Sequence, residues 1–370
     1  MSARRPALDG RRVLVVGAGV AGLAVARALR GSGAGVEVVD RAAAPAVGGA
    51  GIFLPANAVR GLRLLGLEDA VLGSAVPIAR QEVADHRGRV LYEVGTDSVW
   101  QGIAPTVATH RAALHAALLD GAGHVEIRWG VGPGSIVPDG PEADVTFDDG
   151  TSGRYDLVVG ADGAHSTVRR LVFGDAGLRP SGLHAWRLLG PRGDTEAVWS
   201  VRLGRGVTFL TFPIGPDLVY HYVDVSADDA DAGLDGLVAR FGAPVAELVA
   251  AATVAHSGPI EEVSLAPWSR GPVLLVGDAA HATTPSMAQG AAMAFEDALV
   301  LADVLGRAAS VPDALREYEE RRRPRVEQVQ EQTRRRDRTR GLHPAARNGL
   351  LRVAGERLFR ANYRGMHAVP

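Results

Sequence analysis

The chain has 370 residues, a formal net charge of −2, 46% hydrophobic residues and 22% charged residues, a composition typical of a globular protein with two domains or one elaborated domain. It contains no cysteine, which excludes disulfides, thiolate catalysis and cysteine-ligated metal. All 40 basic residues are arginine, so lysine Schiff-base chemistry and a phosphate-binding lysine are excluded as well. The balanced charge does not indicate nucleic-acid binding, and we expect no bound metal.

The first predicted elements are a buried strand over Val13–Val16 and a helix from about Val20 to Leu29. Between them lies a G-x-G-x-x-G pattern made by Gly17, Gly19 and Gly22. In this pattern the first glycine permits a tight turn, the second lets the backbone approach a pyrophosphate, and the third lets the helix pack closely on the strand. The start of the helix, with Val20 and Ala21, would direct free N–H groups and the helix dipole at the phosphates.

The next predicted strand, GVEVVD, ends in Asp40, close to twenty residues after the glycines. A carboxylate at this position accepts hydrogen bonds from both ribose hydroxyls, and its charge repels a 2′-phosphate. The first motif therefore predicts a bound FAD or NAD rather than NADP, with Arg41 also counted among the nucleotide contacts.

The middle of the chain alternates between helical and strand-like segments. Residues 49–67 read as a glycine-rich loop that leads into a helix, and residues 78–94 read as a hairpin that turns at 86–89. A helix is expected from Arg111 up to Gly121, and residues 124–150 carry strand patterns with turn signals. Residues 181–225 are rich in strand patterns.

The rest of the chain reads as mainly helical. A helical stretch is expected over roughly 232–252, then a strand, VLLVGD, and a helix from about Gly290 to Leu305. An arginine-rich helix is expected over roughly 312–340. Acidic residues interrupt its arginines, which favours a solvated helix with pairs four residues apart over a membrane or nucleic-acid surface.

Two further segments resemble parts of the same nucleotide site. DLVVGADGAHSTVRR begins at Asp156, and VLLVGDAAHATTPSMAQGAAMAFEDA begins at Val273. Each alone is ambiguous, and the Asp162-Gly163 pair taken by itself is better explained as a turn after a buried strand. The order and wide spacing of the three segments favour a flavin-binding oxidoreductase whose cofactor site is assembled from distant parts of the chain.

With these three segments, the chain resembles the single-component FAD-dependent aromatic-ring hydroxylases related to para-hydroxybenzoate hydroxylase. Within them it is most similar to the branch of salicylate, urate and zeaxanthin-type monooxygenases. The resemblance extends from Val13 to about Arg325. Smaller matches are GIFLPANA from Gly51, Trp268 and YEERRRPR from Tyr318. Ala288 departs from the family, which usually has glycine there.

The resemblance implies an α/β fold: a Rossmann-like FAD-binding domain with an inserted β-rich substrate domain and a C-terminal helix. The expected FAD-binding domain is discontinuous and takes residues 1–72, 100–178 and 256–345. Residues 73–99 and 179–255 would form the substrate domain, and 346–370 a C-terminal helical tail.

The resemblance also implies roles for individual residues. Asp162 would belong to a stretch linked to both FAD and the nicotinamide cofactor, Asp278 would contact the ribityl or pyrophosphate part, and Arg111 would approach the pyrophosphate. Pro285 would lie in a loop beside the flavin, with Gln289 and Gly290 at the start of a long helix. The backbone N–H groups of Gly290, Ala291 and Ala292 would then stabilise negative charge on the flavin ring. Glu296 and Asp297 are expected to be structural.

A family member of this kind would use NAD(P)H as a transient reductant and O₂ as co-substrate. It would hydroxylate or epoxidise a small aromatic, heteroaromatic or alkene substrate through a flavin C4a-hydroperoxide. Tyr220 matches a position near substrate in the related branch; His221 is a second candidate as base, and Arg187 could pair with an anionic substrate. Because residues alternate along a strand, Tyr220 and His221 are expected on opposite faces, with Tyr222 beside Tyr220.

Two other functions remain open from the sequence. One is an FAD-dependent reductase of alkenes, and the other is a flavin-binding protein without turnover. We expect a cytoplasmic monomer or homodimer that has no nucleic-acid or membrane partner.

Overall fold

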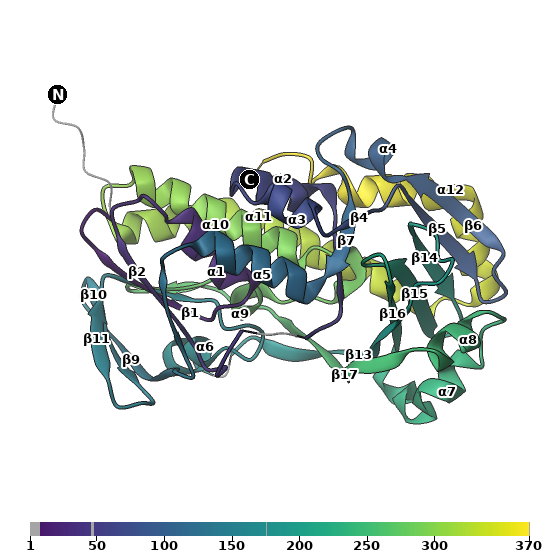
Figure 1. Ribbon diagram of the computed structural model, residues 1–370, viewed down its shortest axis with the longest axis horizontal. Helices are drawn as coiled ribbons and strands as arrows, with labels where there is room; N and C mark the ends of the chain where they lie inside the picture. The colour runs from purple at the N-terminus through teal and green to yellow at the C-terminus, as the bar shows by residue number, and fades with distance from the viewer. Residues whose placement is uncertain (1–7, 46–47, 175, 370) are drawn as a thin grey trace.

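The computed structural model describes residues 8–45, 48–174 and 176–369. Figure 1 shows an elongated molecule with a nucleotide-type lobe at one end and a β-rich lobe at the other, joined by the long strands β13 and β17. The sequence expectation of an α/β fold with a Rossmann-like part is confirmed.

The nucleotide lobe is built on a six-stranded sheet. Its strands are parallel except at one edge, where Ser269–Arg270 pairs antiparallel with Val273–Leu275. In spatial order its strands are β18 (Ser269–Arg270), β19 (Val273–Leu275), β12 (Leu157–Gly160), β1 (Arg12–Val16), β2 (Gly35–Asp40) and β8 (Glu126–Trp129). Apart from the exposed Arg12 at the start of β1, the strands β1, β12 and β19 are apolar and buried, as expected for parallel strands covered on both faces.

Helices cover this sheet, and the longest of them come from the C-terminal half of the chain. They are α1 (Val20–Ala28), α5 (Arg111–Ala122), α6 (Thr167–Phe173), α9 (Asp278–His281), α10 (Gly290–Arg307) and α11 (Val311–Arg338). Figure 1 shows α1, α5, α10 and α11 stacked over the same face of the sheet. A small antiparallel sheet of β9 (Pro133–Asp139), β10 (Glu142–Phe147) and β11 (Ser152–Tyr155) completes this lobe.

The β-rich lobe is a seven-stranded sheet. In spatial order its strands are β17 (Thr253–Val263), β13 (Leu178–Pro191), β16 (Leu218–Ser226), β15 (Val207–Pro213), β14 (Val198–Leu203), β5 (Arg80–Asp85) and β6 (Val90–Gly95). Its outer face packs on η1 (Ala227–Ala232), α7 (Gly233–Val238) and α8 (Val245–Ala250). The division into domains remains a prediction, although β17 continues in this sheet past residue 256, where we expected the boundary.

The remaining elements connect the lobes. They are β3 (Gly51–Leu54), β7 (Val107–His110) and β4 (Val76–Pro77) in a small sheet, with α2 (Ala56–Leu64), α3 (Glu68–Leu72), α4 (Thr96–Trp100), η2 (Pro285–Met287), η3 (Thr339–Gly341) and α12 (Pro344–Arg364). In Figure 1, α12 crosses to the β-rich lobe and lies beside β6.

Three predictions of local structure need correction. Gly51–Leu54 is a strand, not part of a loop, because it pairs with β7. The helical stretch expected over 232–252 is two short helices, since Pro244 begins a new one. The arginine-rich segment is only partly solvated. Arg322 is buried and Arg340 is half-buried, and each forms an ion pair with an acidic residue of a distant element that a local charge pattern does not reveal.

The buried apolar residues form one large cluster in the nucleotide lobe and one on each face of the seven-stranded sheet. Within the described part of the chain, no helix is both long enough and apolar enough to cross a membrane.

Candidate active site

The three sequence motifs converge because they follow neighbouring parallel strands. Val16 at the end of β1 is in register with Gly160 of β12, which is in register with Leu275 of β19. Each motif therefore leaves the sheet at the same edge, where ligands of open parallel sheets bind. Val39, one residue before Asp40, is also in register with Val16.

A cavity of about 1250 Å³ opens at this edge and extends to the seven-stranded sheet. This exceeds the roughly 300–1,000 Å³ of a pocket for one drug-sized ligand. Predicted residues that line it are Gly17, Gly19, Val20, Ala21, Asp40, Arg41, Arg111, Asp162, Arg187, Tyr220, Asp278, Pro285, Gly290 and Ala291. Gly22, His221, Gln289 and Ala292 are not among its lining residues.

The glycine loop has the shape that a nucleotide cradle needs. A Cβ atom on Gly17 would lie 2.5 Å from the carbonyl oxygen of Ala161, and one on Gly22 would lie 1.8 Å from that of Gly17. These two glycines are required by the protein's own packing. A Cβ on Gly19 would meet nothing within 4 Å. The missing side chain at Gly19 therefore leaves room for a ligand rather than for another part of the chain.

Asp40 both shapes the loop and faces the cavity. Its carboxylate accepts hydrogen bonds from the backbone N–H of Ala18 at 2.7 Å and of Ala42 at 2.8 Å. Each carboxylate oxygen keeps a further lone pair for a ribose hydroxyl. From the facing helix α5, His115 contacts the carbonyl oxygen of Ala18 at 2.7 Å. No sequence motif pointed to His115, although it lies one helical turn after Arg111 on the same face of α5.

Asp162 is engaged by its own segment. Its carboxylate accepts hydrogen bonds from the hydroxyl of Ser166 and the backbone N–H groups of Thr167 and Val168, and burial raises its pKa. It therefore orders the start of α6 while lining the cavity. Asp278 differs: it is exposed, begins α9, and has no hydrogen-bond or ion-pair partner among the described residues. Asp278 is the freer carboxylate for a cofactor hydroxyl.

The start of α10 faces the cavity without a cap. No side chain caps this helix, and its first turn carries no acidic residue. Gly290 and Ala291 line the cavity, so their N–H groups are available to a negatively charged ligand edge. Gln289 is buried and exchanges hydrogen bonds with Asn57 at 2.8 and 3.3 Å, which ties the start of α10 to α2.

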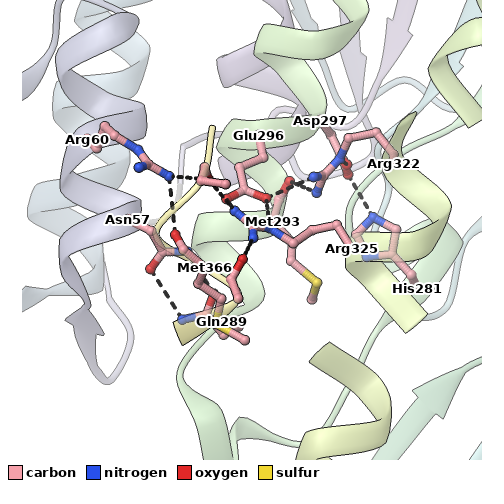
Figure 2. Close-up of polar contacts among 12 residues, drawn as sticks. Asn57, Arg60, His281, Gln289, Met293, Glu296, Asp297, Arg322, Arg325 and Met366 are labelled. Carbon is pink, nitrogen blue, oxygen red and sulfur yellow. Dashed lines mark hydrogen bonds and ion pairs between the residues drawn. The ribbon is translucent and has the colours of Figure 1, made fainter. Parts of the chain in front are cut away.

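A buried ion network supports this helix from behind (Figure 2). Asp297 of α10 accepts hydrogen bonds from the backbone N–H of Gly277 at 2.8 Å and from Arg322 of α11 at 2.7 Å, and it contacts His281 at 2.7 Å. Glu296 pairs with Arg322 at 2.8 Å and with Arg325 at 3.0 Å.

The network fixes the third motif in place. Burial opposes ionisation of Asp297, but the charges of His281 and Arg322 outweigh it and hold the pKa of Asp297 below its usual range. Arg322 has no exposed side-chain surface. The Asp297 carboxylate therefore stays charged at neutral pH. The ion pairs of Asp297 and Glu296 join α10 to α9 and α11, which explains the YEERRRPR segment by structure rather than by catalysis.

The other end of the cavity is aromatic. Phe53 lies 4.1 Å from Trp199 and 5.9 Å from Phe212 between ring centroids, and Phe212 lies 5.1 Å from Tyr220. A Cβ on Gly51 would lie 2.6 Å from the Tyr220 Cβ, so this glycine lets β3 pack against the tyrosine. The indole N–H of Trp199 is buried without a partner in the described part of the chain.

Arg187 and Tyr222 lie beside this aromatic group. The Arg187 guanidinium is 5.9 Å from the centroid of the Tyr222 ring, and it forms no ion pair with a carboxylate of the described residues. The Tyr222 hydroxyl is buried and unpartnered there as well. Burial raises the pKa of Tyr220 to about 12 and that of Tyr222 still further, so both phenols are protonated at neutral pH.

His221 points to the other face of the sheet. Its ring stacks on Phe209 at 5.6 Å, within the cluster that packs under α7 and α8. Burial lowers its pKa to about 4. His221 is thus not brought to the cavity, and the prediction that it could act as a base is wrong on geometry; the expected alternation of Tyr220 and His221 explains why.

The C-terminal part of the chain also reaches the cavity, which the motifs did not indicate. Arg340 pairs with Asp224 of β16 and hydrogen-bonds Ser286 of η2 at 3.3 Å. Asp337 accepts hydrogen bonds from Thr284 and Ser286. These contacts attach the end of α11 to the loop before α10.

No cluster of three or more potential metal ligands occurs in the described ranges.

Comparisons with known proteins agree with this geometry. The family model described as "FAD binding domain" matches residues 11–179 and 246–333. The 2-heptyl-3-hydroxy-4(1H)-quinolone synthase of Pseudomonas aeruginosa is 36% identical over 343 residues, covering 87% of both chains. The 3-amino-4-hydroxybenzoate 2-monooxygenase of Streptomyces cremeus is 36% identical over 353 residues, covering 88% of this chain and 86% of the relative.

Among solved structures, Klebsiella pneumoniae HpxO complexed with FAD and uric acid superposes with a TM-score of 0.86. It is 28% identical, and the match covers 97% of each chain. The relatives and the fold agree over nearly the whole length, and the family model matches more than half of the chain. The chain belongs to the FAD-binding family of aromatic hydroxylases and is an FAD-dependent oxidoreductase.

Proposed function

We propose that this protein is an NAD(P)H-consuming monooxygenase that inserts one oxygen atom into a small aromatic or heteroaromatic substrate. The observation that carries the proposal is the single cavity that joins the nucleotide cradle to the aromatic group around Tyr220. The matched relatives named as monooxygenases support the same reaction class.

The cradle residues fit FAD. Gly17, Gly19 and the start of α1 would hold the pyrophosphate, and Asp40 would bind the adenosine ribose. Arg111 and Asp278, exposed and without ion-pair partners among the described residues, would hold the middle of the cofactor. When bound, FAD would supply electron transfer from NAD(P)H and the activation of O₂.

The uncapped start of α10 would act on the ring system. The N–H groups of Gly290 and Ala291, together with the helix dipole, would stabilise negative charge on the pyrimidine edge of the flavin. The ion pairs of Asp297 and Glu296 with Arg322 would keep those groups from moving as charge develops.

On the substrate side, the chain would bind and orient the substrate and exclude water from it. Phe53, Trp199 and Phe212 present ring faces or edges to a planar molecule. Arg187 would bind an anionic or strongly hydrogen-bonding oxygen, because it interacts with Tyr220 and Tyr222 and has no carboxylate partner among the described residues. Tyr220 would donate a hydrogen bond from its phenol, since it stays protonated at neutral pH.

These features favour a phenol or a hydroxylated heteroaromatic as substrate. The relatives are named for a quinolone, an aminohydroxybenzoate and, in a solved complex, uric acid, all of which are planar and oxygen-substituted. An alkene substrate would leave Arg187 without a partner, and we therefore rank epoxidation below hydroxylation.

The test is reduction of the purified, FAD-loaded protein by NADH or NADPH without oxygen, with and without a panel of phenols, hydroxypyridines, quinolones and urate. We expect one panel member to accelerate flavin reduction, and product with one added oxygen atom once O₂ is admitted. Reduction of an alkene with no oxygen in the product would identify a reductase instead.

A further inference from the structure

The seven-stranded sheet presents to the cavity a continuous row of residues, one from each strand. The row changes from polar and charged residues at one edge of the sheet to mainly apolar residues toward the other. The row follows from the strand register. His256 of β17 is opposite Arg187 of β13, and Arg187 is opposite Tyr222 of β16. All three line the cavity. This half of the row is cationic and hydrogen-bonding, and it lies beside the aromatic group assigned to the substrate ring.

The row continues with apolar residues. Tyr222 is opposite Leu210 of β15, Leu210 is opposite Val201 of β14, and Val201 is opposite Val83 of β5. Val83 is in turn opposite Tyr92 of β6. These residues also line the cavity. Adjacent strands lie about 4.8 Å apart, so the apolar strip runs for about 14 Å from Tyr222 to Val83.

The helix α12 forms the other side of this strip. Leu351, Gly355, Leu358 and Phe359 line the cavity, and their spacing of three and four residues places them on one face of the helix. A Cβ on Gly355 would lie 2.2 Å from the ring of Tyr92, so this glycine lets the helix lie directly on β6.

Polar groups flank the strip without interrupting it. On one side, Asp224 and Thr208 are already bonded to Arg340. On the other, Gln332 and Arg336 of α11 line the cavity, and Arg336 interacts with Tyr92 of β6 and Tyr363 of α12, so its guanidinium lies at the β6 end of the strip. The surface between β5, β14, β15 and α12 is therefore an apolar slot that opens from the ring-binding site.

We propose that the substrate carries an apolar tail, and that this slot between the sheet and α12 binds it while Arg187 and Tyr222 bind the polar end of the ring. The proposal deepens the proposed function and rests on it for the position of the ring. A substrate without a tail would leave an apolar cavity beside the reacting ring, where water would enter, against the need to exclude it.

Isothermal titration of the FAD-loaded protein with phenol and 4-alkylphenols from methyl to heptyl, without NAD(P)H, tests the slot by binding alone. We expect the dissociation constant to fall with each added methylene, by up to about fourfold, the factor that corresponds to burial of about 0.8 kcal/mol per CH₂. A dissociation constant that does not change along the series would overturn the proposal.

Two variants locate the tail. Val201→Phe fills the slot; it should bind phenol like the unaltered protein but lose the gain from the longer chains, a selectivity that misfolding would not produce. Leu358→Glu places a charge in the slot and should weaken heptylphenol binding at least tenfold, whereas Val353→Glu, on the same helix but 90% exposed, should not. Equal chain-length gains in Val201→Phe and the unaltered protein would contradict the assignment.

The outcome is separable from the proposed function. Chain-length dependence without oxygen insertion into any panel member would sink the monooxygenase proposal but keep the slot. Oxygen insertion into short phenols with no chain-length dependence would do the opposite.

Discussion

The two lobes build their halves of the cavity in different ways. In the nucleotide lobe, the site consists mainly of backbone groups and bare glycines at strand ends, and buried ion pairs such as Asp297–Arg322 hold it from behind. In the β-rich lobe, the site consists of side chains on one sheet face, and the opposite face packs on apolar helices.

The difference explains what each half can vary. A cofactor that is common to a family needs the same backbone conformation in each member. The glycine loop and the uncapped N-terminus of α10 provide it, whichever side chains surround them. A substrate is bound by side chains, so we expect that exchanging one residue in the row from Arg187 to Tyr92 changes specificity without changing the fold.

The largest effect is expected from removing the central cation of the buried network. Arg322→Met leaves Asp297 without its guanidinium partner in the interior and weakens the pairing of Glu296. We expect a loss of about 3–5 kcal/mol in the free energy of unfolding, measured by urea denaturation, because an unpaired buried charge is costly. FAD retention on heating should fall with it.

The matched control is Arg335→Met in the same helix, whose pair with Glu331 is 71% exposed on the arginine side. This change should cost less than about 1 kcal/mol, as surface pairs do. Similar losses in the two variants would contradict the idea that buried ion pairs hold the nucleotide half.

A second prediction separates cofactor shape from protein packing. Gly19 has an extended backbone with φ −82° and open space around its missing Cβ. Gly19→Val should therefore leave the unfolding free energy of the FAD-free protein nearly unchanged while weakening FAD binding about 100-fold, or about 2.7 kcal/mol. Titration followed by flavin fluorescence measures the affinity. Unchanged FAD binding would show that the loop does not hold the pyrophosphate.

A third prediction concerns the far face of the sheet. His221 has a pKa of about 4 when folded, because burial opposes its charged form, against about 6.5 when unfolded. Between these values the unfolded chain binds the proton first, so stability should fall as the pH drops from 6.5 to 4, on the order of 2–3 kcal/mol from this residue. Above pH 6.5 its contribution is constant.

His221→Phe should make the free energy of unfolding less steeply pH-dependent over that window, as measured by denaturation at several pH values. Because His221 lies away from the cavity, the pH profile of turnover relative to the unaltered protein should not change shape. A lost ionisation in the turnover profile would place His221 in the chemistry after all.

The smallest effect is expected at Ala288. It adopts the left-handed region at φ 51° in the turn before α10 and lines the cavity. Glycine tolerates this conformation more readily, so Ala288→Gly should raise stability by up to about 1 kcal/mol. Thermal unfolding of the FAD-loaded protein measures it. A clear loss of stability would show that the Ala288 methyl packs against its neighbours to greater benefit than the strain it costs.

The features that could be predicted from the sequence are those that depend on local patterns, and they differ between the two lobes. The positions of the glycine loop, of Asp40 at the end of β2 and of the start of α10 could be predicted because they depend on local spacing along the chain. The opposite orientations of Tyr220 and His221 followed from strand alternation alone. These predictions needed no knowledge of which strands pair.

The residues that were missed depend on distant pairing. The part of the row from Arg187 to Val83 depends on the register of five strands. No local sequence pattern fixes a register between strands a hundred residues apart. Arg322 and Arg340 looked like surface arginines because their carboxylate partners lie 25 or more residues away. The cavity wall formed by α12 was hidden for the same reason.

We propose that one chamber brings reduced flavin, oxygen and an aromatic ring together. The decisive measurement is turnover in isotope-labelled O₂, with the product of the best panel substrate analysed by mass spectrometry. We expect one labelled oxygen atom per product molecule, and a loss of that product in Arg187→Met while FAD binding is kept. Unlabelled product, or a reduced substrate with no added oxygen, would contradict it.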